Sequence, residues 1–222
     1  SNSGFGLVAG VRQLTIKRST LNINPAQGDL VTTPDSGIGY VAGVSYEMPE
    51  IALKVLLTQA PGIDIVVPTT VVGSGTVSQP SFTTLEFETG IANNTLMFGS
   101  IHQGEHASAQ VKLNGIGAIR SFTDRDRYNI GVGRKFSEKL SGSFSYTTEE
   151  GSSATGTSLL SPTNGTDTYS IGVNYVTESV DVAFGYAMSS FGDKAVTTAY
   201  GTGNFTNNDA TTTGLRVKFK LP

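Results

Sequence analysis

The feature of this sequence that most restricts its fold is a repeated alternation of apolar and polar side chains with a period of two. The last such segment, Leu215 to Leu221, has apolar side chains at every second position and cations between them. Successive side chains of a β-strand point to opposite faces, so the period predicts strands and not helices. Ten segments fit this pattern: 4–18, 38–47, 51–58, 82–91, 95–111, 128–136, 140–146, 169–175, 180–188 and 215–221.

Two of these segments depart from a simple alternation. In the first, the apolar positions change phase between Val11 and Leu14, and we expect a β-bulge near Gln13 to account for the change. In the segment that follows Thr95, Gly104 to His106 interrupt the pattern, which makes it the least regular of the ten.

The connections between the segments alternate strictly between short and long. The short ones are Met48–Glu50, Ala92–Asn94, Ser137–Lys139 and Thr177–Ser179; the long polar ones are 19–36, 62–80, 107–123, 149–167 and 189–209. An outer-membrane barrel has an even number of strands, short periplasmic turns and long extracellular loops. We therefore predict an all-β fold, an antiparallel transmembrane β-barrel of about ten strands that occupies residues 1–222 as one domain of the bacterial outer membrane.

The composition agrees with strands that cross a membrane. No run of apolar residues approaches the ~18 that a spanning helix needs, and charged residues are only 15% of the chain. The alternative is a secreted β-sandwich, jelly roll or soluble β-solenoid, but the outer face of a sandwich would carry more charge than the Gly, Ser and Asn found opposite the apolar rows. Tyr46, Phe136, Tyr146 and Tyr175 lie near strand ends, where an aromatic interface girdle is expected.

Three stretches resemble one family. In order and spacing, these stretches are similar to segments of the FadL/TodX outer-membrane transporters of long-chain fatty acids and aromatic hydrocarbons. They are Tyr46 to Leu53 (YEMPEIAL), Phe87 to Ser100 without its turn (FETGIA and TLMFGS), and Leu160 to Gly165 (LSPTNG). The resemblance extends from about residue 37 to the C-terminus. It implies a porin-like, passive transporter and not an enzyme.

The chain also departs from that family. The resemblance implies fourteen strands and an N-terminal hatch, whereas we expect about ten strands and no preceding hatch from this sequence. His102 to Glu105 replace a more aromatic segment that contains arginine, and the chain ends in Leu221-Pro222 without a terminal aromatic residue. We expect either the C-terminal part of a larger barrel or a smaller barrel, whose narrow interior side chains would largely fill.

The resemblance implies passage of hydrophobic small molecules such as long-chain fatty acids, without a cofactor. The alternative is a structural or accessory barrel subunit of a membrane complex. The charged residues expected to face the lumen, where they could hold a carboxylate or pair with one another, are Glu47, Lys54, Glu86, Glu88, Asp181, Arg216, Lys218 and Lys220.

The expected partners are outer-membrane lipids and lipopolysaccharide, a hydrophobic ligand or detergent, and other membrane-protein subunits. Nucleic acid is not expected, because the net charge is −3 and no basic run is present.

Two further clusters contain residue types that can bind ions. His102, Glu105 and His106 could bind a metal, but on a straight strand the two histidines would lie ~13 Å apart, and no catalytic triad is evident, so neither a metal site nor catalysis is predicted. Asp124 to Arg127 could contact lipopolysaccharide phosphates or a divalent ion, although such a cluster is more often a self-paired, solvated rim.

Overall fold

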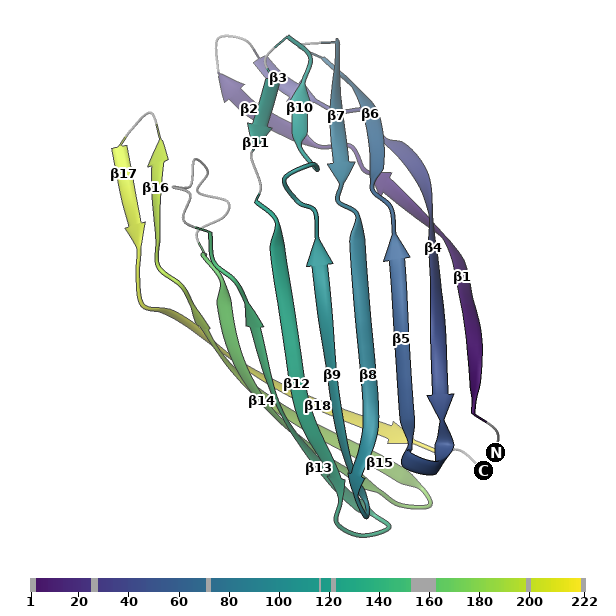
Figure 1. Cartoon of the computed structure of the whole chain (residues 1–222). Coiled ribbons are helices and arrows are strands. Elements are labelled where there is room, and N and C mark those ends of the chain that lie inside the picture. Colours follow the sequence, from purple (N-terminus) through teal and green to yellow (C-terminus); the bar gives the residue numbers. More distant parts are fainter. Residues whose placement is uncertain are drawn as a thin grey trace.

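Ten long antiparallel strands form one curved sheet (Figure 1). The computed structural model describes residues 3–24, 28–70, 73–115, 117–120, 123–152, 163–198 and 201–220. In sheet order the strands are β1 (Gly4–Ile16), β4 (Asp35–Met48), β5 (Leu53–Ala60), β8 (Phe82–Ala92), β9 (Thr95–Gly104), β12 (Arg125–Lys135), β13 (Leu140–Glu149), β14 (Thr166–Val176), β15 (Val180–Phe191) and β18 (Asn208–Phe219). Their order in the sheet is their order in the chain, so the predicted antiparallel all-β fold is confirmed.

The short connections lie at one end of this sheet, together with both ends of the chain (Figure 1). One of them is the 3-10 turn η1 (Pro49–Ile51), which ends at Ala52 in the left-handed conformation, with φ 50°. Ile51 therefore belongs to a turn and not to the strand in which the alternation had included it. By the topology of outer-membrane barrels, this end is the periplasmic end.

The long connections contain hairpins, which the expectation of polar loops did not include. Their strands are β2 (Thr20–Asn24), β3 (Gly28–Val31), β6 (Ile63–Thr69), β7 (Gly73–Gln79), β10 (Val111–Leu113), β11 (Gly117–Arg120), β16 (Lys194–Thr198) and β17 (Gly201–Phe205). Four of them, from two different connections, form a second sheet in the order β11-β10-β7-β6.

The ten-stranded sheet exposes apolar side chains instead of burying them. Among the described residues, every buried hydrophobic side chain belongs to the hairpins and connections: Leu30, Ile63, Ile65, Val67, Ala109, Leu113 and Val196. Within the main sheet, Leu7 is 88% exposed and Leu215 is 70% exposed, and 25 other large apolar residues are also exposed in the chain. Such a surface is unfavourable in water but suits the hydrocarbon of a bilayer.

No helix in the described part of the chain is long and apolar enough to span a membrane.

Aromatic residues mark both ends of the apolar face. Tyr146 and Tyr169 lie next to each other near the extracellular ends of β13 and β14, with ring centroids 5.0 Å apart. Tyr46 and Tyr175 lie near the periplasmic ends of β4 and β14, and Phe136 follows β12 there. Their placement is the one that an interface girdle requires.

The second sheet lies over the polar face of β1 and β4. Ile63 and Ile65 of β6 form its buried core with Val67, and Leu14 and Ile16 of β1 pack against that core. The predicted bulge near Gln13 is wrong, because β1 pairs with β4 without a register shift from Gly4 to Ile16. Leu14 and Ile16 are apolar on the otherwise polar face because β6 covers them.

Glycines of β4 allow β6 to approach the wall. A side chain at Gly37 would place its Cβ 2.5 Å from Ile63 Cγ2 and 3.0 Å from Ile65 Cγ1. In addition, the Arg12 guanidinium donates a hydrogen bond to the carbonyl oxygen of Pro61, just before β6. The second sheet is thus fastened to the inside of the wall at the extracellular end.

Replacing Gly37 with Val is expected to release β6 from the wall while the barrel wall still forms. Overpacking of this kind costs about 1–3 kcal/mol, so the detached state should become roughly tenfold or more populated. Limited proteolysis of the detergent-solubilised protein should then cut residues 62–80 correspondingly faster. Gly185→Val is the matched control, because a Cβ at Gly185 meets no atom within 4 Å. Equal cleavage of both variants would contradict this packing.

Candidate lumenal site

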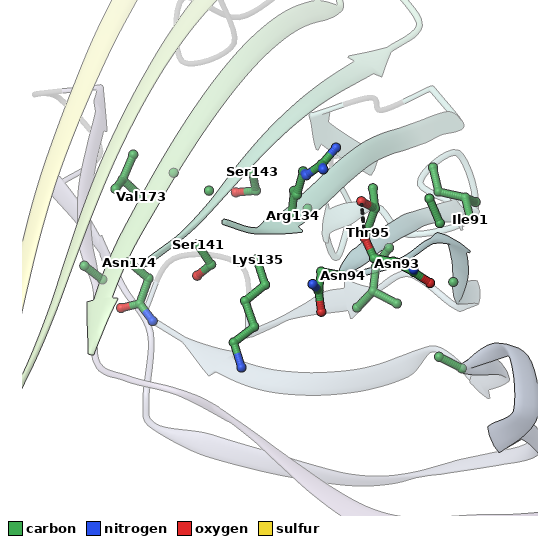
Figure 2. A pocket seen from close by; sticks show the side chains of 18 of the residues that line it. Ile91, Asn93, Asn94, Thr95, Arg134, Lys135, Ser141, Ser143, Val173 and Asn174 are labelled. Atoms are coloured by element: carbon green, nitrogen blue, oxygen red, sulfur yellow. Dashed lines mark hydrogen bonds between the residues drawn. The ribbon is translucent and has the colours of Figure 1, made fainter. Parts of the chain in front are cut away.

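An open cavity lies along the polar face of the wall at the periplasmic end. The cavity has a volume of about 1080 Å³ and reaches from Glu50 in η1, on one side, to Arg216 of β18 on the other. Residues from β8, β9, β12, β13, β14 and β15 line it between these limits. The sheet is therefore concave on its polar face, and Figure 2 shows the side chains of β12, β13 and β14 that line it.

Four of the eight predicted lumenal charges form a group on neighbouring strands, which we call the acidic group: Glu47, Lys54, Glu86 and Glu88. The register places Glu47 beside Lys54 and Lys54 beside Glu88. Lys54 Nζ lies 3.4 Å from Glu47 Oε1, and both side chains are about half exposed. An exposed pair of this kind stabilises a fold by at most about 1 kcal/mol. Lys54, Glu86 and Glu88 also line a smaller hollow that contains Phe98.

The other four predicted charges form a second group, which we call the basic group: Asp181, Arg216, Lys218 and Lys220. Asp181 of β15 lies beside Lys218 of β18 in the register. Lys220 Nζ lies 3.0 Å from Asp181 Oδ1 and donates a hydrogen bond to the Thr177 carbonyl oxygen at 2.8 Å. Each of these two ion pairs thus joins residues of the same group. A role of these eight residues in substrate passage stays a prediction.

Two lumenal residues were missed by the sequence reasoning. Lys135 and Asn174 belong to one lateral row of the register, in which Lys135, Ser141, Asn174, Ala183 and Arg216 lie on five consecutive strands. Figure 2 shows Lys135, Ser141 and Asn174 pointing to the same side of the sheet. Gly131, Gly133 and Lys135 alternate along the polar face of β12, so continuing this alternation to the end of the strand would have predicted a lumenal Lys135. The neighbouring Arg134 has the opposite phase.

The extracellular end of the concave face carries an aromatic cluster, made of Phe82, His102 and His106. The His102 ring stacks on Phe82 at a centroid distance of 5.0 Å, and the His106 ring meets Phe82 edge-on at 5.8 Å. His102 Nδ1 lies 2.8 Å from Thr84 Oγ1. Both histidines contact Phe82 because β9 ends at Gly104, so the ~13 Å estimate, which assumed a straight strand, does not apply to this pair. Among the described residues, no three His, Asp or Glu side chains gather closely enough to hold a metal ion.

The charges from Asp124 to Arg127 have partners within the protein. Arg125 and Arg127 both bind Glu149, at 3.0 Å and 2.8 Å. Asp124 accepts a hydrogen bond from the backbone N–H of Ala107, and Asp126 accepts hydrogen bonds from the side chains of Gln103 and Tyr128. These contacts favour the self-paired rim over a site for phosphate or a divalent ion.

Comparison with known proteins gives the fold a precedent. No protein-family model matches the sequence, and no curated protein matches it. Among solved structures, a Pseudomonas aeruginosa FadL homologue superposes with a TM-score of 0.62 at 12% identity, over 97% of this chain and 62% of that one. The CymD monoaromatic hydrocarbon channel superposes with a TM-score of 0.54 at 13% identity, over 91% of this chain and 56% of that one.

A third structure is a TodX deltaS2S3 mutant monoaromatic hydrocarbon channel, with a TM-score of 0.56 at 12% identity, over 98% of this chain and 66% of the channel. The chain thus spans about three fifths of the length of the structures that it matches. The likeness confirms the fold that the three short sequence stretches had suggested. This fold is that of barrels of the bacterial outer membrane, which is the predicted location of the chain. Residues 160–162, in the third of those stretches, lie outside the described residues.

Proposed function

Because the chain has the fold of the FadL and TodX outer-membrane channels, we propose that it forms the wall of a passive channel for hydrophobic small molecules, such as long-chain fatty acids. The observation that carries the proposal is the position of the cavity. Apolar side chains face outward along the main sheet, while a space of about 1080 Å³ lies on the polar, concave side. A solute could therefore move inside a wall whose outside is in contact with lipid.

The channel also needs a closed wall. In the described part of the chain, β1 and β18 are the edge strands of the main sheet, and each pairs with one neighbour only. Unpaired backbone groups are costly in hydrocarbon, where no water can hydrogen-bond to them, so both edges must pair in the membrane. Pairing β1 directly with β18 would give a ten-stranded barrel, and additional strands would give a wider one.

The contents of the interior favour the wider barrel. The second sheet packs on the inside of β1 and β4, and stacked sheets are about 10 Å apart. Eight strands enclose only enough room for side chains, so ten leave little space for another sheet and a cavity. We propose that further strands, encoded outside this sequence, lie between β18 and β1. Residues 1–222 would then be the C-terminal part of a larger barrel.

The proposed transport is tested by uptake in cells that lack their own fatty-acid channel. Expression of the complete protein is expected to raise uptake of radiolabelled oleate several-fold over that of cells without it, while uptake of glucose is unchanged. Ser143→Trp, which places a large side chain in the cavity lining, should remove most of the gain. Ser179→Trp, in an exposed periplasmic turn, is the matched control and should not.

The same experiment distinguishes transport from a structural role. Protein that reaches the outer membrane as a heat-modifiable barrel, yet changes uptake of neither oleate nor an aromatic hydrocarbon, would overturn the channel and favour an accessory subunit. Equal uptake by the Ser143→Trp and Ser179→Trp variants would mean that the cavity is not the path.

A further inference from the structure

The outward face of the main sheet carries few charges, and they are unevenly placed. Within the described strands of this sheet, the register assigns four charged residues to the apolar, outward face: Asp126, Arg134, Asp167 and Asp209. The three aspartates lie at the extracellular ends of β12, β14 and β18, whereas Arg134 lies near the periplasmic end of β12. Arg134 is therefore the one cation on the lipid-facing side of these strands.

Two observations place the Arg134 side chain on the outward face. Along β12 it continues the phase of Ile130 and Val132, whose side chains are exposed. Figure 2 shows Arg134 and Lys135 pointing to opposite sides of the same strand. Because the lysine faces the lumen, the arginine faces the membrane.

Arg134 has no partner in the described part of the protein. Its side chain is exposed and makes neither an ion pair nor a hydrogen bond with any residue that the structure describes. In contrast, the outward carboxylates of Asp126 and Asp167 accept hydrogen bonds from neighbouring side chains. An unpaired cation on a lipid-facing strand is costly unless its long side chain reaches the headgroups. We therefore expect its partner outside the wall.

The surface around Arg134 suits the apolar part of a lipid. Phe136 is 63% exposed, and its ring lies against Gly142, where an added Cβ would be 3.0 Å from Phe136 Cε2. Arg134 is the direct neighbour of Gly142 across the strands, so the guanidinium and the ring rise from adjoining positions. Leu140 and Val132 are exposed on the same face. Phe136 belongs to the periplasmic girdle, which lies at the level of the headgroups.

We propose that Arg134 binds the phosphate group of a phospholipid in the periplasmic leaflet. The Phe136 ring lies beside the glycerol backbone of this lipid, and its acyl chains extend along the outward face of β12 and β13. A guanidinium presents paired N–H donors that match two phosphate oxygens, so the contact is bidentate and charge-assisted. The site goes beyond the proposed channel function, because it lies on the outside of the wall and needs no solute in the lumen.

Native mass spectrometry of the complete, detergent-solubilised protein tests the site. The probe is dioleoyl phosphatidylglycerol, and dioleoylglycerol, which lacks the phosphate, is the matched ligand. Arg134→Gln is expected to raise the apparent Kd of the most tightly bound phosphatidylglycerol about tenfold, the loss of a charge-assisted hydrogen bond, and to leave dioleoylglycerol binding unchanged. Arg134→Lys, which keeps the charge but not the paired donors, should give an intermediate Kd.

Lys135→Gln is the matched control, because it removes the same charge one residue away on the lumenal face and should change the binding of neither lipid. A heat-induced gel shift verifies that each variant is folded. A tenfold loss confined to Arg134→Gln and to the lipid with a phosphate supports the site. Unchanged phosphatidylglycerol binding in the Arg134→Gln variant overturns it. An equal loss in the Lys135→Gln variant would overturn it as well, because net charge would then attract the lipid. Displacement of the lipid by inorganic phosphate would mean that Arg134 binds a free anion, which also contradicts the proposal.

Discussion

Replacing Ile171 with Arg is expected to lower the free energy of unfolding from lipid bilayers by about 2–4 kcal/mol, the cost of a cation at the bilayer midplane. Ile171 lies on the outward face of β14, between Tyr169 and Tyr175 in sequence and beside Phe144 and Tyr186 in the register. It is 48% exposed although the strands on both sides are present. Hydrocarbon is the environment in which that exposure is favourable.

The neighbouring position provides the control. Ser170 has the opposite phase and lies beside Ser145 and Ala187 on the concave face, so Ser170→Arg should cost far less. Denaturant unfolding in vesicles, followed by circular dichroism, measures both variants. If Ser170→Arg is the more destabilising of the two, the faces have been assigned the wrong way round. If the two cost the same, the wall is not immersed in lipid.

The main sheet could be predicted from sequence because the bilayer imposes its pattern on every strand. Each strand contacts hydrocarbon on one face, so rows such as Val180 to Met188 keep their period without any knowledge of their neighbours. The short turns confirm the connectivity, since only a hairpin can join strands through the two or three residues at Ala92–Asn94. Local information is sufficient for this part of the fold.

The second sheet could not be predicted in the same way, because it depends on contacts between distant segments. Ile63, Ile65 and Val67 alternate within a connection otherwise rich in polar residues, and their partners are the glycines at 37 and 39 and the apolar end of β1. Seen alone, Leu14 and Ile16 look like a strand that has slipped by one residue. Only the position of β6 identifies them as the base of a buried layer.

The lateral row contains a lumenal residue that the alternation within single strands could not predict. Phase alone placed the eight predicted charges, and the register then sorted them into the acidic and basic groups. Asn174 carried no signal, because an amide on the polar face of a strand is ordinary until its neighbours are known. Its place between Lys135 and Arg216 follows from the pairing of five strands, which the sequence of any one of them does not contain.

Closure of the wall leads to the prediction with the largest effect, an all-or-none difference in cross-linking. The chain contains no cysteine, so introduced pairs can be measured without background. Val182→Cys with Val217→Cys joins facing positions of β15 and β18 and should form a disulfide almost completely. Leu7→Cys or Val11→Cys, combined with Val217→Cys, should form none in the complete protein, because further strands separate the two edges.

Amide hydrogen exchange completes this test, because absence of a cross-link alone would also describe an open sheet. If further strands pair with both edges, the β18 amides that point away from β15 should exchange as slowly as those of the central strand β14. Fast exchange at alternate β18 positions would mean that the edge is free, which overturns a closed wall of any size. Slow exchange together with a cross-link between β1 and β18 would establish a ten-stranded barrel, whose interior would have to accommodate the second sheet. Slow exchange without that cross-link is the expected result, and it means that strands other than these ten of the same chain pair with both edges in hydrocarbon.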